Sequence, residues 1–134
     1  MTLFTEDLAA SIAFYRAFLK TEPVFGDPVS SVFKAGETMI NLLQVSAVPE
    51  LIAPAAMAVP GIRAVYTLAV ADVDAQAVRL AAAGLVLLNG PLDRPWGIRT
   101  LSLADPSGHV WELAAPLKEL ERVAPLPIQD SQIP

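Results

Sequence analysis

Few side chains in this sequence have the type and spacing that catalysis or metal binding requires. Cysteine is absent and His109 is the single histidine. We expect His109, which has no second histidine or cysteine beside it in its predicted turn, to face solvent or cap that turn rather than act as a ligand or base. Glu112 remains as the candidate catalytic residue. Its carboxylate, on an apolar segment, could act as a base, pair with a cation or ligate a metal.

Glu112 belongs to a predicted hairpin that spans residues 94–113. Residues 105–108, Asp-Pro-Ser-Gly, have turn chemistry, because proline presets φ and glycine can take a positive φ. Apolar residues alternate with others on both sides of this turn, which is the pattern of half-buried strands. Alternation places Glu112 on one face of its strand and Trp111 on the other. We therefore predict that Trp111 lies in the core.

The elements that must position this hairpin occur twice along the chain. The first half has a strand at 3–5, a helix capped by Asp7 and ending at Leu19, and strands at 31–34 and 38–45. The second half has a strand at 65–70, a helix capped by Asp72 and ended by Gly84, and strands at 85–88, 98–103 and 110–113. Each half is thus predicted to be a βαβββ module of an α+β fold.

One helix covers only one face of such a small sheet, so the other face needs a partner. Two modules, from one chain or from two chains by swapping, could pair their bare faces and enclose a cup. Proline clusters at 49–60 and 116–134 mark a linker and a tail. The prediction is one domain over 1–116, with module one at 1–48, the linker at 49–60 and module two at 61–116. A tail at 117–134 could cross onto a partner subunit or fray.

The charge of the chain limits its partners. A net charge of −5 over 134 residues disfavours nucleic acid and anionic lipid, and favours a cationic ligand. Apolar runs stop short of the roughly 20 residues that a membrane span needs. The N-terminus lacks the basic and apolar segments of a secretory signal. We therefore expect a cytoplasmic protein without nucleic-acid or membrane partners.

The hairpin also carries a family resemblance. Pro-Trp-Gly-x-Arg at 95–99, Asp-Pro-x-Gly at 105–108 and Glu-Leu at 112–113 resemble the glyoxalase/bleomycin resistance/dioxygenase superfamily, also called vicinal oxygen chelate. The resemblance covers about residues 1–116. It implies two βαβββ modules that form a cupped mixed sheet. In metal-dependent members, it also implies a divalent ion held by strand residues that face the cup.

Most metal-ligand positions implied by the resemblance lack a ligand in this chain. The histidine or glutamine of the first strand would fall at Met1 or just before it. The glutamate of the first half corresponds to Asn41, and the histidine that opens the second half corresponds to Val65. Only Glu112 keeps a ligand type. Because a catalytic divalent ion takes about three protein ligands, we predict no metal and no cofactor.

Strand alternation, combined with these family positions, predicts the lining of the cup. Residues that share a strand face with a ligand position should line it, and residues of the neighbouring loop and strands should form its rim. The predicted ligand-binding residues are Phe33, Met39, Asn41, Leu43, Val65, Thr67, Trp96, Arg99 and Glu112, of which Phe33, Trp96 and Arg99 are at the rim.

The missing metal ligands and the mostly apolar lining of the cup favour a binding protein over an enzyme. The character of the cup is closest to metal-free bleomycin-resistance-like proteins. We predict a homodimer that binds or sequesters an apolar or aromatic small molecule, neutral or cationic, such as an antibiotic with planar rings. The alternative is a glyoxalase-like isomerase or lyase that uses Glu112 as a base, with or without a divalent metal.

Overall fold

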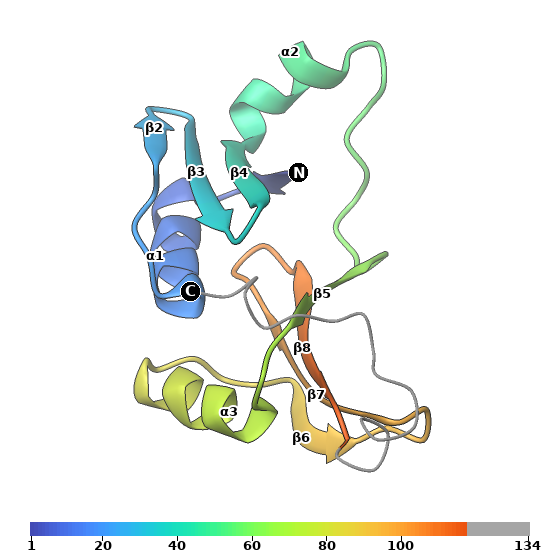
Figure 1. The fold of residues 1–134 in the computed structure, drawn as a ribbon. Coiled ribbons are helices and arrows are strands. Elements are labelled where there is room, and N and C mark those ends of the chain that lie inside the picture. Colours follow the sequence, from blue (N-terminus) through green and yellow to red (C-terminus); the bar gives the residue numbers. More distant parts are fainter. Residues whose placement is uncertain (118–134) are drawn as a thin grey trace.

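A computed structural model describes residues 1–117, which form two four-stranded sheets with helices (Figure 1). The first sheet has the strand order β1-β4-β3-β2 and the second has β5-β8-β7-β6. The first half contains β1 (Thr2–Thr5), α1 (Leu8–Leu19), β2 (Phe25–Asp27), β3 (Ser30–Ala35) and β4 (Thr38–Gln44). The second half contains β5 (Val65–Ala69), α3 (Val73–Ala82), β6 (Asn89–Asp93), β7 (Ile98–Ala104) and β8 (Val110–Pro116). Of the predicted tail, all but residue 117 lies outside the described residues.

The two halves repeat each other in register as well as in order. β1 pairs with β4 in parallel and sets Thr2 opposite Asn41, while β5 pairs with β8 in parallel and sets Thr67 opposite Glu112. The remaining neighbours within each sheet are antiparallel. The predicted α+β fold of two βαβββ modules is confirmed.

Both long helices begin where their capping residues predict. Asp7 Oδ1 accepts a hydrogen bond of 3.0 Å from the amide of Ala10, and Asp72 Oδ1 accepts one of 3.0 Å from the amide of Ala75. These bonds satisfy amides that have no partner within the helix. Among residues 1–117, no helix is long and apolar enough to cross a membrane.

The link between the modules is partly helical. A 3₁₀ turn (Val45–Ala47) and the short helix α2 (Val48–Ile52) follow β4 directly. Residues 53–64 then run to β5 without helix or strand. In Figure 1 this segment passes along the right of the molecule, on the side away from α1 and α3.

The predicted strand at 85–88 is wrong, and the strand before β7 is β6, which begins at Asn89. Residues 84 and 85 instead close α3. Gly84, at φ 82°, donates from its amide to Ala81, and Leu85 donates to Leu80, which is the pattern of a Schellman cap. Leu85 and Leu87 pack against the core as partly buried residues. The ladder with β7 starts only where Leu88 donates to Ser102.

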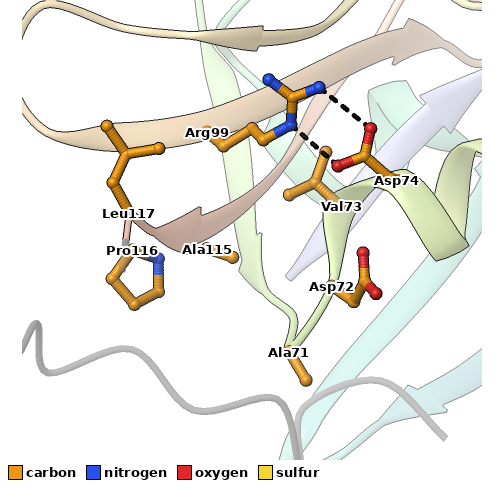
Figure 2. Close-up of a pocket in the computed structure, with 8 residues that line it drawn as sticks. All are labelled: Ala71, Asp72, Val73, Asp74, Arg99, Ala115, Pro116 and Leu117. Carbon is orange, nitrogen blue, oxygen red and sulfur yellow. Dashed lines mark hydrogen bonds and ion pairs between the residues drawn. The ribbon is translucent and has the colours of Figure 1, made fainter. Parts of the chain in front are cut away.

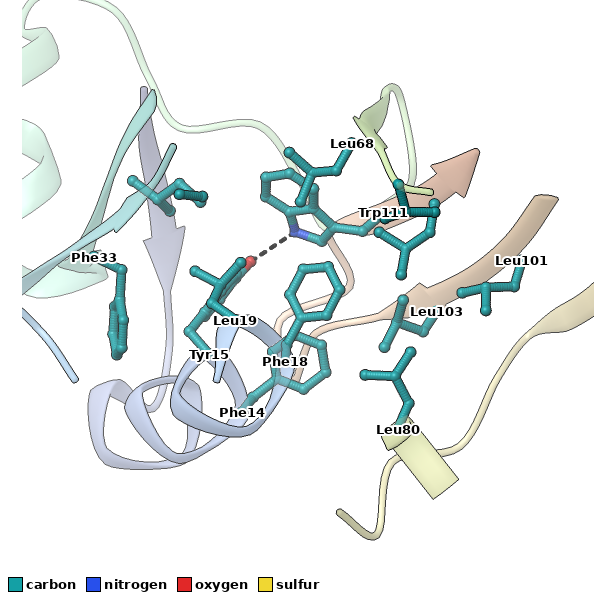
Figure 3. Packing of buried hydrophobic residues seen from close by; sticks show 14 of the residues in the cluster. Phe14, Tyr15, Phe18, Leu19, Phe33, Leu68, Leu80, Leu101, Leu103 and Trp111 are labelled. Atoms are coloured by element: carbon teal, nitrogen blue, oxygen red, sulfur yellow. Dashed lines mark hydrogen bonds between the residues drawn. The ribbon is translucent and has the colours of Figure 1, made fainter. Parts of the chain in front are cut away.

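One hydrophobic core joins the two modules. Tyr15 and Phe18 of α1 pack against Trp111 of β8, with ring centroids 6.2 and 5.6 Å apart (Figure 3). Trp111 is 1% exposed, as predicted for a core residue. Arg79 of α3 donates to the carbonyl oxygens of Ala17 and Phe18 at the end of α1. The first helix is therefore held by both halves of the chain.

A buried carboxylate lies at the same junction. Asp105, whose side chain is 1% exposed, accepts hydrogen bonds from the Tyr15 hydroxyl at 2.7 Å and from the backbone amides of Ser107 and His109. Its Oδ2 also lies 2.7 Å from His109 Nδ1. Trp111 Nε1 donates to the Tyr15 hydroxyl at 2.9 Å. His109 therefore has a carboxylate partner that the sequence analysis did not identify.

Candidate ligand-binding face

The two sheets leave one side uncovered by α1 and α3. α1 packs against β3 and β4, and α3 packs against β6, β7 and β8 (Figure 1). We call the opposite side of the two sheets the helix-free face. On β4, Ile40 and Leu42 are buried in the core beneath α1. Met39, Asn41 and Leu43 alternate with them and so point to the helix-free face.

The second sheet presents its own residues on this face. Leu68 of β5 and Leu113 of β8 belong to the core. Val65 and Thr67 alternate with Leu68, and Glu112 precedes Leu113, so these three side chains lie on the helix-free face. The structure thus places six of the nine predicted ligand-binding residues on one side of the sheets, namely Met39, Asn41, Leu43, Val65, Thr67 and Glu112.

Each module holds a polar pair on this face at the same register position. Thr67 Oγ1 donates to Glu112 Oε1 at 3.0 Å, and Asn41 Nδ2 donates to Thr2 Oγ1 at 3.5 Å. The threonine fixes one oxygen of the half-buried Glu112 carboxylate and leaves the other available for a ligand. Asn41 Oδ1 is buried and has no hydrogen-bond partner among the described residues. The second oxygen of Glu112 can therefore accept a hydrogen bond from a bound molecule, whereas Asn41 Oδ1 is shielded from one.

Arg94 is a candidate site residue that the sequence analysis missed. Its Nε donates to Thr100 Oγ1 at 3.0 Å and its Nη2 donates to Asn89 Oδ1 at 3.2 Å. Thr100 and Asn89 share the helix-free face with Glu112, as the β6, β7 and β8 registers show. Alternation along the sequence could not place Arg94, because the β6–β7 register shifts between Asn89 and Leu92.

Trp96 lies on the loop between β6 and β7, and its side chain is 64% exposed. The Arg94 guanidinium carbon lies 5.9 Å from the centre of its ring, within the range of a cation–π contact. The guanidinium group therefore connects an exposed aromatic ring to the polar side chains of the helix-free face. The Trp96 ring thus provides a flat surface beside the hydrogen-bonding group of Arg94.

Phe33 is not a rim residue. It is 0% exposed and its ring lies 6.1 Å from that of Tyr15, on the helix side of the first sheet. In the β3–β4 register it pairs with Ile40, whereas Val32 pairs with Asn41. A shift of one residue along a strand changes the face, so Val32 has the position on the helix-free face that was predicted for Phe33.

Arg99 is also on the helix side and is not a rim residue of the cup. It pairs with Ala115 in the β7–β8 register and makes ion pairs of 2.8 Å with Asp74 and with Asp93. Hydrogen bonds from Arg99 hold the pKa of Asp74 below its usual value, and the two aspartates raise the pKa of Arg99. Figure 2 shows Arg99 and Asp74 at the edge of a cavity of about 410 Å³ that reaches Leu117.

Comparison with known proteins agrees with this fold. The sequence profile of the Glyoxalase/Bleomycin resistance protein/Dioxygenase superfamily matches residues 1–113. The chain belongs to this superfamily. A segment of 53 residues, which is 40% of the chain, is 42% identical to an uncharacterized protein of Mycobacterium bovis. That segment covers 35% of the Mycobacterium protein, so the match spans about a third of this relative.

Solved structures of the superfamily have the same fold. A glyoxalase-related enzyme from Fulvimarina pelagi is 31% identical, with a TM-score of 0.73 over 85% of this chain and 84% of that one. A glyoxalase/bleomycin resistance protein/dioxygenase from Nocardioides is 25% identical, with a TM-score of 0.77 over 96% and 85%. Lactoylglutathione lyase from Agrobacterium tumefaciens shares the fold at 24% identity, with a TM-score of 0.69 over 85% and 89%.

The donor set on the helix-free face does not fit the metal that some members of the superfamily bind. Val65 has no lone pair, and Asn41 offers a neutral amide oxygen where the resemblance implies a carboxylate. Glu112 is the remaining anionic ligand type at the positions the resemblance implies. Within residues 1–117, no three histidine, cysteine, aspartate or glutamate side chains are grouped to hold an ion. The residues at these positions therefore do not supply the three protein ligands of a catalytic divalent ion.

Proposed function

We propose that this member of the superfamily binds and sequesters a small organic molecule with planar aromatic rings, in the manner of bleomycin-resistance proteins. The observation that supports the proposal is the Glu112 carboxylate. Thr67 holds it on a face that has few other side chains able to bind a metal. Exposed apolar side chains lie on the same face of the two sheets. Val65 is 55% exposed and Met39 is 45% exposed.

The side chains of this face suit an aromatic ligand that is neutral or cationic. Planar rings stack on aromatic side chains for roughly 0.5–1.5 kcal/mol beyond the burial of area, and Trp96 is available for such stacking. The free oxygen of Glu112 could pair with a ligand cation or accept a hydrogen bond from an amide. Hydrogen bonds to Thr100 and Asn89 hold the Arg94 guanidinium beside the Trp96 ring.

We also propose that the protein is a homodimer in which a second copy covers the helix-free face. Exposed apolar side chains that cluster on one side of a protein mark an interaction surface. Light scattering coupled to size-exclusion chromatography should give twice the mass of one chain. The substitution Val65→Asp, at an exposed position of β5 on this face, should shift the mass toward that of a single chain. A monomeric mass of the unsubstituted protein at all concentrations would contradict the dimer.

Ligand binding is tested by titration with a panel of planar aromatic antibiotics, both cationic and neutral, while tryptophan fluorescence and Tm are recorded. Cationic members should bind, and Glu112→Gln should weaken their binding about tenfold, because a charge-assisted hydrogen bond is lost. Glu37→Gln, in the exposed turn after β3, is the matched control and should bind as the unsubstituted protein does. No response across the whole panel would count against this function.

A second candidate function is an isomerase or lyase reaction with Glu112 as the base. The hydrogen bond from Thr67 favours it, because it holds one carboxylate oxygen in place and leaves the other free to take a proton. Formation or cleavage of lactoylglutathione, the activity in the name of the Agrobacterium relative, is a direct assay. The variant Glu112→Gln should then lose turnover and keep binding, whereas a sequestering protein shows no turnover before or after the substitution.

A further inference from the structure

The single histidine of the chain has a fixed orientation and a fixed proton position. Burial raises the pKa of Asp105, but hydrogen bonds from His109 and Tyr15 outweigh it and hold this pKa below its usual value. The carboxylate is therefore ionised at neutral pH and can only accept hydrogen bonds. His109 Nδ1, 2.7 Å from Asp105 Oδ2, must then carry a proton. In the neutral ring this leaves Nε2 as a hydrogen-bond acceptor.

His109 lines two cavities beside the linker. The larger, of about 210 Å³, lies between Phe4 and Glu6 at the end of β1, linker residues 57–61 and the turn before β8. The smaller, of about 150 Å³, is bounded by the following linker residues and Tyr66. Three residues line both cavities, His109, Gly61 and Gly108, so the two cavities adjoin there. Neither cavity includes Glu112.

We propose that this junction is a second small-molecule site, in which His109 Nε2 accepts a hydrogen bond from a small and mostly apolar ligand that carries a hydroxyl or N–H group. The larger cavity is below the roughly 300 Å³ of the smallest drug-sized pockets, so the ligand is about the size of one substituted ring. Phe4, Met57 and Val59 supply apolar walls. Glu6 on the same wall disfavours an anion.

Charged side chains lie around His109 and the two cavities. Asp105 contacts the ring from the core side and is itself bonded to Tyr15, Glu6 faces the larger cavity, and Arg63 lines the smaller one beside Tyr66. When the ring takes a second proton, Nε2 becomes a donor and can no longer accept a bond from the ligand. A ligand that donates from a hydroxyl group therefore requires a ring with a single proton, at Nδ1.

Nitrogen-15 NMR of the imidazole tests the site directly, because a chain with one histidine gives one unambiguous pair of ring signals. At a pH where the ring is neutral, the full chain should show the Nδ1–H tautomer. Addition of 4-cyanophenol should shift the Nε2 signal, and 4-methylbenzonitrile, which has the same shape without the hydroxyl, should not. A ring in the Nε2–H tautomer, or an Nε2 signal unmoved by millimolar 4-cyanophenol, would overturn the proposal.

The substitution His109→Asn separates the two ring nitrogens. The asparagine amide can still donate to Asp105 from the position of Nδ1, but it places no acceptor at the position of Nε2. Affinity for 4-cyanophenol should fall about tenfold in this variant. Unchanged affinity would contradict the assignment of Nε2. If the variant does not fold, the spectra of the unsubstituted protein still decide the question.

Discussion

Replacing Asp105 with alanine is expected to lower the free energy of unfolding by about 3–5 kcal/mol. The substitution leaves the buried Tyr15 hydroxyl, the Ser107 amide and the His109 amide without their acceptor. It also removes the partner of the His109 ring. Because Tyr15 belongs to α1 and the turn belongs to the second module, the loss weakens the junction between the modules. Urea denaturation followed by circular dichroism measures the change.

Asp93→Ala is the matched control for this substitution. Asp93 also makes an ion pair, with Arg99, but its side chain is 59% exposed. Exposed ion pairs contribute little because water screens them. Asp93→Ala should therefore change stability far less than Asp105→Ala. Equal effects of the two substitutions would show that burial of the Asp105 network does not stabilise the fold.

The pKa of Asp105 also makes the stability of the protein depend on pH. Its pKa in the folded protein lies below the ordinary value of 3.8. The contribution of this carboxylate to the free energy of unfolding is therefore complete above pH 3.8. It is lost as the pH falls from 3.8 through the lower pKa of the folded protein. Stability measured over this acid range should fall less steeply in Asp105→Asn than in the unsubstituted protein, because one shifted carboxylate has been removed.

Phe18→Ala is expected to cost about 3–5 kcal/mol, the range for truncation of a buried phenylalanine. Phe18 is 0% exposed, and its ring lies 5.5 Å from that of Phe14 and 5.6 Å from that of Trp111. The cavity would therefore open between α1 and the second sheet rather than inside one module. Since both modules share this core, the variant should still unfold in a single transition.

Chemical denaturation followed by two signals tests this prediction. Far-ultraviolet circular dichroism reports on both modules, and tryptophan fluorescence reports on Trp96 and Trp111 in the second. Coincident curves would support a shared core. Val78→Ala, on α3 with the side chain 72% exposed, is the control and should have little effect. Separate transitions in the unsubstituted protein would show that the modules fold independently.

Local chemistry explains why much of the fold could be predicted. The capping carboxylates of Asp7 and Asp72, the positive φ of Gly84 and the turn at residues 105–108 act over a few residues. Their repetition in the same order indicated two modules. The strand predicted at 85–88 failed because apolar residues next to a helix can also close its cap, and the pattern alone does not distinguish the two roles.

The sequence by itself determined the fold, the superfamily and the loss of metal-ligand types at the positions of Asn41 and Val65. Only the tertiary structure decided which face each strand residue occupies. A side chain changes face with a shift of one residue, and register depends on distant partners such as Ile40 for Phe33 and Ala115 for Arg99.

The acceptor role of His109 also depended on tertiary structure, because the Asp105 that orients it is held by Tyr15, 90 residues away along the chain. Arg94 joined the helix-free face for a similar reason. Its hydrogen bond to Asn89 spans a register shift that no periodic pattern in the sequence reveals. Short-range propensities therefore determined the elements, while long-range packing and register determined which of their side chains meet.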